Sequence, residues 1–177
     1  MRRGVSFMAP SPVIALLDVD YRSDHALAAC VLLRDWGDEL PVRDLTARVT
    51  DVAPYEPGSF YKRELPCLLA VLGTVNDPLA CVVVDGYVWL DANSRAGLGA
   101  HLYRALGEST PVVGVAKTRF GDGTFAVEAL RGASLRPLYV TSAGIDVNLA
   151  ADHVRAMHGP YRIPTALARV DALCRKG

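Results

Sequence analysis

Two short, unbroken apolar runs restrict the fold of this chain more than any other feature. They read LACVVVDG at positions 79–86 and PVVGVAK at positions 111–117. A strand with one face in solvent alternates apolar and polar residues, whereas an unbroken run of this length indicates a strand that is covered on both faces. Covering both faces of a sheet requires helices on each side of it. We therefore predict an α/β fold in which a mixed sheet lies between two helical layers.

The segments around these runs supply the other strands and the helices. Three β-rich runs come first, separated by the short turn signals RSD and GDE, and predict an antiparallel meander: 13–21, 25–36 and 40–52. Helical spacing is found at four places: 58–72, 95–106, 147–157 and 164–174. Two further strands are expected around the polar turn RGASLR, over 125–130 and 137–144. The order predicts a three-strand meander followed by parallel strands.

The composition is typical of a single globular domain, spanning residues 1–177. Hydrophobic residues make up 51% of the chain and charged residues 21%, and the 19 basic residues balance 19 acidic ones. A net charge of zero excludes a chain-wide field for polyanions, so any nucleic-acid surface has to be local. The arginine-rich segment 153–177 is one candidate for such a surface, and a solvated helix face is the alternative.

Two features predict a cytoplasmic protein. The first twelve residues contain no apolar stretch typical of a signal peptide, and no apolar run is long enough for a membrane span. The four cysteines form no CxxC pair, and three of them lie within apolar runs. We therefore expect them to be reduced and buried, and not to be zinc ligands or members of disulfides.

Carboxylates end two of the predicted strands. LLDVDY places Asp18 at the end of an apolar run, with Asp20 on the same face because side-chain direction in a strand repeats every two residues. VVVDG ends in Asp85 in the same way. An ionised carboxylate is costly to bury unless it is paired or bound to a metal. For either residue alone, the alternative is a strand that ends at the solvent boundary, with Asp-Gly as an ordinary turn.

Glu64 and Lys117 add to this pattern. Phe60, Glu64 and Leu68 are spaced to share one helix face, which directs the Glu64 carboxylate toward the sheet. Pro66 is expected to loosen or restart the helix nearby. Carboxylates from two strand ends and one helix face suit Mg²⁺, and two such ions can activate water and stabilise the leaving oxygen of a phosphodiester. Lys117 closes GVAK, where it can meet a phosphate or neutralise the carboxylates; a plain strand-end lysine is the alternative.

In these segments the chain resembles the endonuclease V family, nucleases that cut beside deaminated purines such as inosine and have a ribonuclease H-like fold. The matching pieces, in family order, are LDVDY, PYEPGSFYKRELP, VVVDG, RAGLGAHL, PVVGVAK and YRIP followed by RVDA. The resemblance implies Mg²⁺-assisted hydrolysis, with Mn²⁺ as a possible substitute, of the second phosphodiester on the 3′ side of the lesion in DNA or RNA. We expect the protein to act as a monomer.

The resemblance also assigns roles to residues. Asp18, Glu64 and Asp85 are implied to be the catalytic carboxylates that bind Mg²⁺, and Lys117 falls on the family's active-site lysine. Tyr55 falls in the loop that the family uses as a wedge beside the damaged base, where an aromatic ring can stack on an unpaired or flipped nucleotide. The other substrate-binding positions implied by the matching motifs are Pro54, Pro57, Gly58, Arg63, Gly86 and Arg95.

The chain departs from the family pattern at three places. After the DG strand it has Ala92 or Asn93 where the family has a histidine, and near the C-terminus it offers Gly144 and Asp146 where the family has a second one. Asp20 replaces a small residue, either as an extra ligand or as a like charge that raises nearby pKa values. The four histidines elsewhere are expected to be packing or surface residues. Two alternatives follow: a catalytically impaired nucleic-acid-binding domain of the same fold, and a ribonuclease H-like nuclease for another structured substrate.

Overall fold

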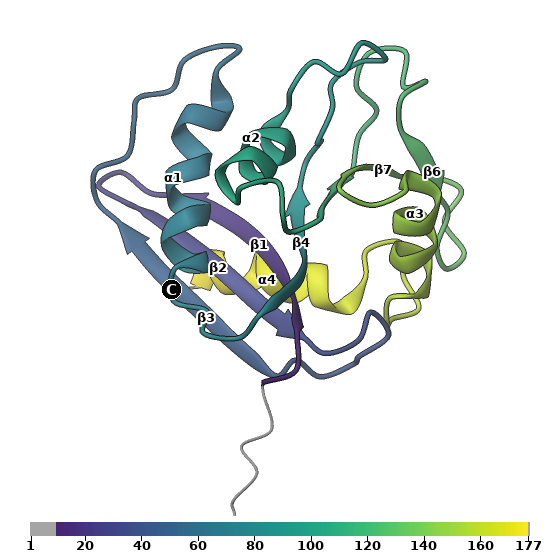
Figure 1. Cartoon of the computed structure of the whole chain (residues 1–177), viewed down its shortest axis with the longest axis horizontal. Coiled ribbons are helices and arrows are strands. Elements are labelled where there is room, and N and C mark those ends of the chain that lie inside the picture. The colour runs from purple at the N-terminus through teal and green to yellow at the C-terminus, as the bar shows by residue number, and fades with distance from the viewer. Residues whose placement is uncertain (1–9, 177) are drawn as a thin grey trace, which may run out of the picture.

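The computed structural model describes residues 10–176 of the chain. In this part the chain forms a seven-stranded mixed sheet, in the order β3-β2-β1-β4-β5-β7-β6, with four helices (Figure 1). The strands are β1 (Val13–Tyr21), β2 (Ala26–Leu33), β3 (Arg43–Val49), β4 (Leu79–Asp85), β5 (Val112–Ala116), β6 (Val127–Ala129) and β7 (Leu138–Ala143). The helices are α1 (Phe60–Leu72), α2 (Leu98–Ala105), α3 (Val147–Ala156) and α4 (Thr165–Lys176). The predicted mixed α/β fold is confirmed.

Strand direction brings three strand ends together. β1, β2 and β3 form the predicted antiparallel meander. β4 lies parallel to β1, and β5 lies parallel to β4, while β7 and β6 extend the sheet in antiparallel pairing. Because β1, β4 and β5 run in one direction, their carboxyl ends lie at the same edge of the sheet, where ligands of open α/β sheets bind.

Helices cover both faces of the sheet. Figure 1 shows α1 and α2 in front of the sheet and α4 behind it. Side chains alternate along the central strand β4, so that Val82 and Val84 pack in the core beneath α1 and α2, whereas Val83 packs in the core beneath α3 and α4. All three valines are buried. Burial on both sides explains the unbroken apolar run in the sequence.

A tight turn fixes the start of α1. The Ser59 amide donates to the Glu56 carbonyl oxygen at 3.0 Å, and Gly58 has a φ of 79°. Pro57 followed by a glycine with positive φ is the pattern of a type II turn. Pro66 lies inside α1, which runs through it without a break. Of the two effects expected of this proline, a restart of the helix is therefore absent.

The cysteines and the loops are placed as follows. All four cysteines are buried and free, as predicted. Within residues 10–176 no helix has the length and apolar character that a membrane crossing needs.

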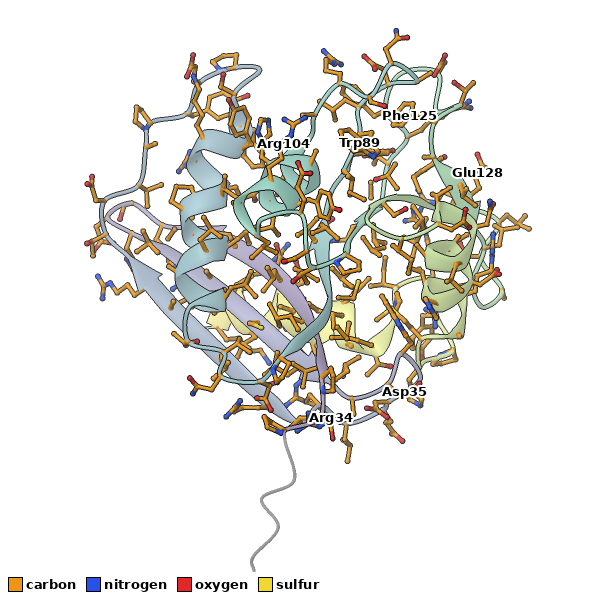
Figure 2. All side chains as sticks on the ribbon, in the orientation of Figure 1. Arg34, Asp35, Trp89, Arg104, Phe125 and Glu128 are labelled. Atoms are coloured by element: carbon orange, nitrogen blue, oxygen red, sulfur yellow. The ribbon has the colours of Figure 1, made fainter. Side chains whose placement is uncertain are left out.

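Figure 2 shows Trp89 and Phe125, from the loops after β4 and β5, at one end of the molecule, and Arg34 and Asp35, from the β2–β3 connection, at the opposite end. The loops at the first end border the candidate site.

Candidate active site

Two neighbouring strands each bring one carboxylate to the site. The parallel pairing of β1 with β4 has Leu17 beside Val84. The next residues along the two strands are Asp18 and Asp85, so these carboxylates lie on adjacent strands at the same level. Lys117 follows the last residue of β5, and its Nζ lies 2.5 Å from Asp85 Oδ2. The predicted convergence of strand-end charges is therefore present for these two aspartates and the lysine.

Glu64 approaches the same place from α1. Its side chain is buried, with 9% of its surface exposed, and Oε2 has no hydrogen-bond partner among the described residues. The pKa of Glu64 is raised to about 8, first by burial and then by the charges of Asp18 and Asp85. A pKa near 8 means that the neutral carboxyl form of Glu64 predominates at neutral pH in the absence of a cation.

Asp18 shares this electrostatic environment. Its pKa is raised to about 6, chiefly by burial and then by the charges of Asp85 and Asp171. The Val19 amide donates to Asp18 Oδ1 at 2.9 Å and lowers the pKa, and the Lys117 charge lowers it further. Burial and like charges outweigh these two effects. A cation that binds such a cluster has to displace protons from it, so its affinity rises with pH.

Asp171 on α4 is a fourth carboxylate beside the cluster, which the motifs above do not single out. Its charge raises the pKa of Asp18, and it also contributes to the raised pKa of Lys117. Its Oδ1 accepts a hydrogen bond from Arg175 Nη2 at 2.9 Å. The RVDA motif was the available signal for this residue. Helical spacing alone gave no reason to direct it toward the end of β1, because that contact depends on how α4 crosses the sheet.

Asp20 has a structural role. Its Oδ2 lies 3.2 Å from Arg22 Nε in an ion pair. Arg22 also donates to the backbone carbonyl oxygens of Cys174 and Arg175. Asp20 therefore orients an arginine that ties the end of β1 to the end of α4.

A hollow of about 330 Å³ opens beside Glu64 and Asp85. Its mainly apolar wall includes Gly58, Phe60, Gly86, Tyr87, Arg95 and Phe120. The Arg95 guanidinium carbon lies 5.7 Å from the centre of the Phe120 ring. A concave apolar hollow with a few polar groups is the usual form of a small-ligand site, and this one is large enough for a nucleobase. Three of the predicted substrate-binding residues meet here: Gly58, Gly86 and Arg95.

A second, more polar groove of about 200 Å³ is lined by other predicted residues. Pro54, Tyr55 and Arg63 line it, and the Tyr55 side chain is 63% exposed. The Arg63 guanidinium lies 3.9 Å above the ring of Tyr21, which no motif singled out. Pro57 belongs to the turn before α1 and lines neither of these two hollows. The structure thus divides the predicted substrate-binding residues between two hollows on either side of α1.

In the two segments where the family has histidines, this chain instead makes ordinary hydrogen bonds between an aspartate side chain and backbone amides. Asp91 Oδ1 accepts from the amides of Asn93 at 2.9 Å and Arg95 at 3.1 Å, which closes the turn that also contains Ala92. Asp146 accepts from two amides of the first turn of α3 and caps that helix. The four histidines pack or bond elsewhere, as predicted: His25 on Asp24, His101 on Tyr61, His153 on Trp36 and His158 on Thr165.

The donor set fits a hard cation, although the side chains stand apart. Within residues 10–176 no three His, Cys, Asp or Glu side chains converge closely enough to form a complete metal site. Asp18, Glu64 and Asp85 nevertheless offer carboxylate oxygens, which Mg²⁺ prefers, and Glu64 Oε2 is buried without a partner in this part of the chain. Lys117 pairs with Asp85. A cation at this site therefore competes with the Lys117 ammonium group for Asp85.

Comparison with known proteins agrees with the sequence motifs. The family model for endonuclease V matches residues 5–134 of the chain. The endonuclease V of Streptomyces avermitilis is 32% identical over an alignment of 189 positions. The alignment covers 90% of this chain and 78% of that protein. A crystal structure of endonuclease V from the same species has a TM-score of 0.73 at 30% identity, over 96% of this chain and 82% of that one.

A second solved structure shares the fold at lower identity. It is Ciona intestinalis endonuclease V in complex with a 24mer DNA that contains an inosine followed by a ribo-adenosine. The TM-score is 0.76 at 19% identity, over 98% of this chain and 90% of that one. Family model, sequence identity and fold agree over most of the chain, and the chain therefore belongs to the endonuclease V family.

Proposed function

We propose that this nuclease is a Mg²⁺-dependent endonuclease that hydrolyses a phosphodiester bond on the 3′ side of a deaminated purine, inosine, in DNA or RNA. One observation carries the proposal: Asp18 and Asp85 end the adjacent parallel strands β1 and β4, and Glu64 from α1 lines the same hollow as Asp85 with a buried oxygen that has no partner among the described residues. Carboxylates that crowd together in a partly buried place repel one another unless a cation offsets the repulsion. A hydrolase that handles a phosphate through metal ions needs such a cluster.

Each group has a task that its position supports. Asp18, Glu64 and Asp85 would hold Mg²⁺, or Mn²⁺ in its place, through their oxygens. When bound, the ion polarises the phosphate and lowers the pKa of a bound water. Burial lowers the pKa of Lys117, but its bond to Asp85 outweighs this effect, so the ammonium group stays charged. Its positive charge lies beside Asp85, in reach of a phosphate that enters the site.

The hollow beside Glu64 and Asp85 is the proposed seat of the deaminated base. Gly58 and Gly86 have no side chain to fill it, and Arg95 presents a donor to the acceptors that a 6-oxopurine carries on its edge. Tyr55, exposed at the neighbouring groove, is placed to stack on the bases that the flipped nucleotide leaves behind. The inosine-containing DNA in the Ciona intestinalis complex supports this choice of substrate.

A cleavage assay on matched strands tests the proposal. Labelled DNA and RNA strands that differ only by inosine or adenosine at one position are incubated with the protein and Mg²⁺ or Mn²⁺. We expect cuts in the inosine strands alone, with 3′-hydroxyl and 5′-phosphate ends on the 3′ side of the lesion. Intact inosine strands across a broad pH range would overturn the proposal.

A second candidate function is a nucleic-acid-binding domain without catalysis. It is favoured by the Lys117–Asp85 ion pair at 2.5 Å and by the incomplete convergence of the ligands within residues 10–176. Calorimetric titration with Mn²⁺ separates the two: binding that disappears in Glu64→Gln supports the nuclease, and the absence of binding supports the domain without catalysis. Cleavage of mismatched, abasic or branched strands in preference to inosine would instead identify a nuclease with another structured substrate.

We also propose that the chain forms one domain that acts as a monomer in the cytoplasm. The four free, buried cysteines support a reducing compartment. Sedimentation at several protein concentrations tests the monomer, with a concentration-dependent increase in mass as the contrary result.

A further inference from the structure

A cationic cleft adjoins Lys117. It has a volume of about 260 Å³, and its lining includes Lys117, Arg119, Leu135, Arg136, Tyr139 and Arg162. Four of its lining residues are lysine or arginine and none is acidic. A cleft with charge of one sign concentrates the electric field, so it can attract a polyanion even though the whole chain has no net charge.

The arginines of this cleft are not neutralised within the part of the chain that the structure describes. Arg119 donates to the carbonyl oxygen of Asp122, Arg162 donates to carbonyl oxygens only, and Arg136 is exposed without an ion pair in residues 10–176. Other arginines of the segment 153–177 each pair with an aspartate: Arg155, Arg169 and Arg175. Among the arginines of this segment, the one without an ion pair in residues 10–176 is therefore Arg162 in the cleft, whereas on α4 only Lys176 is a cation without such a pair.

The floor of the cleft is built before any ligand arrives. Arg162 donates to the carbonyl oxygens of Arg136 at 3.0 Å and Pro137 at 2.8 Å, and also to that of Lys117. These bonds join the loop after β5 to the loop before β7. The segment that carries Arg162 is itself held by Arg131, which is 5% exposed and donates to four carbonyl oxygens between Met157 and Arg162. A preformed cleft loses little entropy when it binds a strand.

Shared residues connect the cleft to the rest of the site. Lys117 lines both the cleft and a smaller cavity that also contains Asp18 and Asp85. Asp85 in turn lines the hollow beside Glu64. This hollow, which we call the base hollow, is thus linked through Asp85 to the smaller cavity. The smaller cavity is linked through Lys117 to the cationic cleft.

We propose that the cationic cleft binds the phosphate backbone of the substrate strand on the 3′ side of the scissile bond. This inference rests on the proposed function, which places the base in the hollow and the cut on its 3′ side. A strand that runs from the hollow across the carboxylates then continues in the 3′ direction past Lys117 to Arg119 and Arg136. Leu135, which is 93% exposed, and Tyr139 add apolar surface for sugars or bases, as in other clefts for single strands.

Binding measurements on the full chain test this inference. All proteins carry Asp85→Asn to prevent cleavage, and the probes are fluorescent inosine-containing single strands with a long flank on the 3′ or on the 5′ side only. We expect the double substitution Arg119→Ala and Arg136→Ala to weaken binding of the 3′-flank probe about 10-fold. It should also reduce the slope of log K against log salt by about 1.4, because each lost phosphate contact on a single strand removes about 0.7. The 5′-flank probe should keep its affinity. The matched control is Arg104→Ala, an exposed arginine on α2 (Figure 2).

Each other outcome overturns a defined statement. Equal affinity of the double variant and its parent for the 3′-flank probe overturns the cleft assignment, and a loss confined to the 5′-flank probe overturns the polarity. If the parent binds inosine and adenosine strands alike, inosine recognition in the proposed function fails, while the comparison of variants still decides the cleft. If the parent binds no strand, both are overturned.

Discussion

The carboxylate centre and the recognition rim differ in the kind of structure that carries them. Asp18, Glu64 and Asp85 come from β1, α1 and β4, and Glu64 is only 9% exposed. The rim consists of the loop that carries Tyr55, which is 63% exposed, and the segment 86–97, which is mostly loop. Regular elements would hold the proposed chemistry in fixed positions, whereas loops can change recognition without disturbing them. The carboxylates that the family resemblance assigns are present in this chain. Of its three departures from the family pattern, Asp20 lies within β1 and the other two fall in connecting segments.

The largest expected effect comes from the centre. Asp85→Asn removes a charge but keeps the shape of the side chain, so we expect the fold to remain and cleavage of an inosine strand to fall by more than about 100-fold, because even substitutions around metal ligands cost roughly 10–100-fold. The control is Asp44→Asn, which breaks the ion pair with Arg169 on the surface at 2.6 Å. Comparable activity of Asp85→Asn and Asp44→Asn would place the chemistry elsewhere.

The next test concerns stability of the centre without metal. The folded pKa of Glu64, about 8, lies above its ordinary 4.5, so the folded state binds more protons than the unfolded state between these values. This contribution to stability is fully present below about pH 4.5 and is lost as the pH rises toward 8. In the presence of a chelator we expect the melting temperature to fall over this range and Glu64→Gln to flatten the fall.

Glu128→Gln is the matched control for this measurement, because Glu128 is exposed on β6 (Figure 2). It should leave the pH dependence as in the parent protein. A melting temperature that rises with pH from 4.5 to 8, or the same curve for Glu64→Gln and the parent, would show that Glu64 does not retain a proton in the fold.

A smaller effect is expected from the rim. Tyr55→Ala should weaken binding of an inosine strand about 10-fold, since stacking on one base is worth about 1–3 kcal/mol, and Tyr55→Phe should restore it. Stability should change by less than about 0.5 kcal/mol, as for most surface substitutions. Tyr161→Ala serves as the control, because Tyr161 is 77% exposed and lines neither of the two hollows that contain the predicted residues. Equal losses for Tyr55→Ala and Tyr161→Ala would remove Tyr55 from recognition.

The smallest effect separates a structural aspartate from the catalytic ones. Asp146→Ala removes the cap of α3 and should cost about 1 kcal/mol of stability. Asp152→Ala on the same helix removes only an exposed ion pair and should cost less. Thermal unfolding measures both. Catalytic activity should not change in either variant, and a loss in Asp146→Ala at a temperature where it is folded would assign this residue to the site.

The fold could be predicted because its signals are local. The unbroken apolar run of β4 follows from burial on both faces, and the predicted strands and helices all occur in the structure. Pro66 shows the limit of local reasoning, because tertiary packing of Cys67 and Leu68 against the sheet keeps α1 intact around it. The carboxylates were visible because charges at the ends of apolar runs are unusual.

Other parts of the site depend on contacts that spacing does not reveal. Asp171 reaches the cluster only because α4 packs across β1, and Tyr21 meets Arg63 only because α1 lies over the end of the same strand. The cationic cleft joins loops far apart in the sequence through Arg162. Each of these contacts depends on how whole helices, strands and loops pack against one another. The spacing of residues along the sequence does not show this packing.

The most direct test of the central claim is a crystal of the protein soaked in Mn²⁺ and measured for anomalous scattering. We predict a peak between Asp18 and Asp85, with Glu64 nearby and with Lys117 displaced from Asp85. No peak at these residues in crystals that take up Mn²⁺ elsewhere would contradict the claim that a cation gathers the three carboxylates.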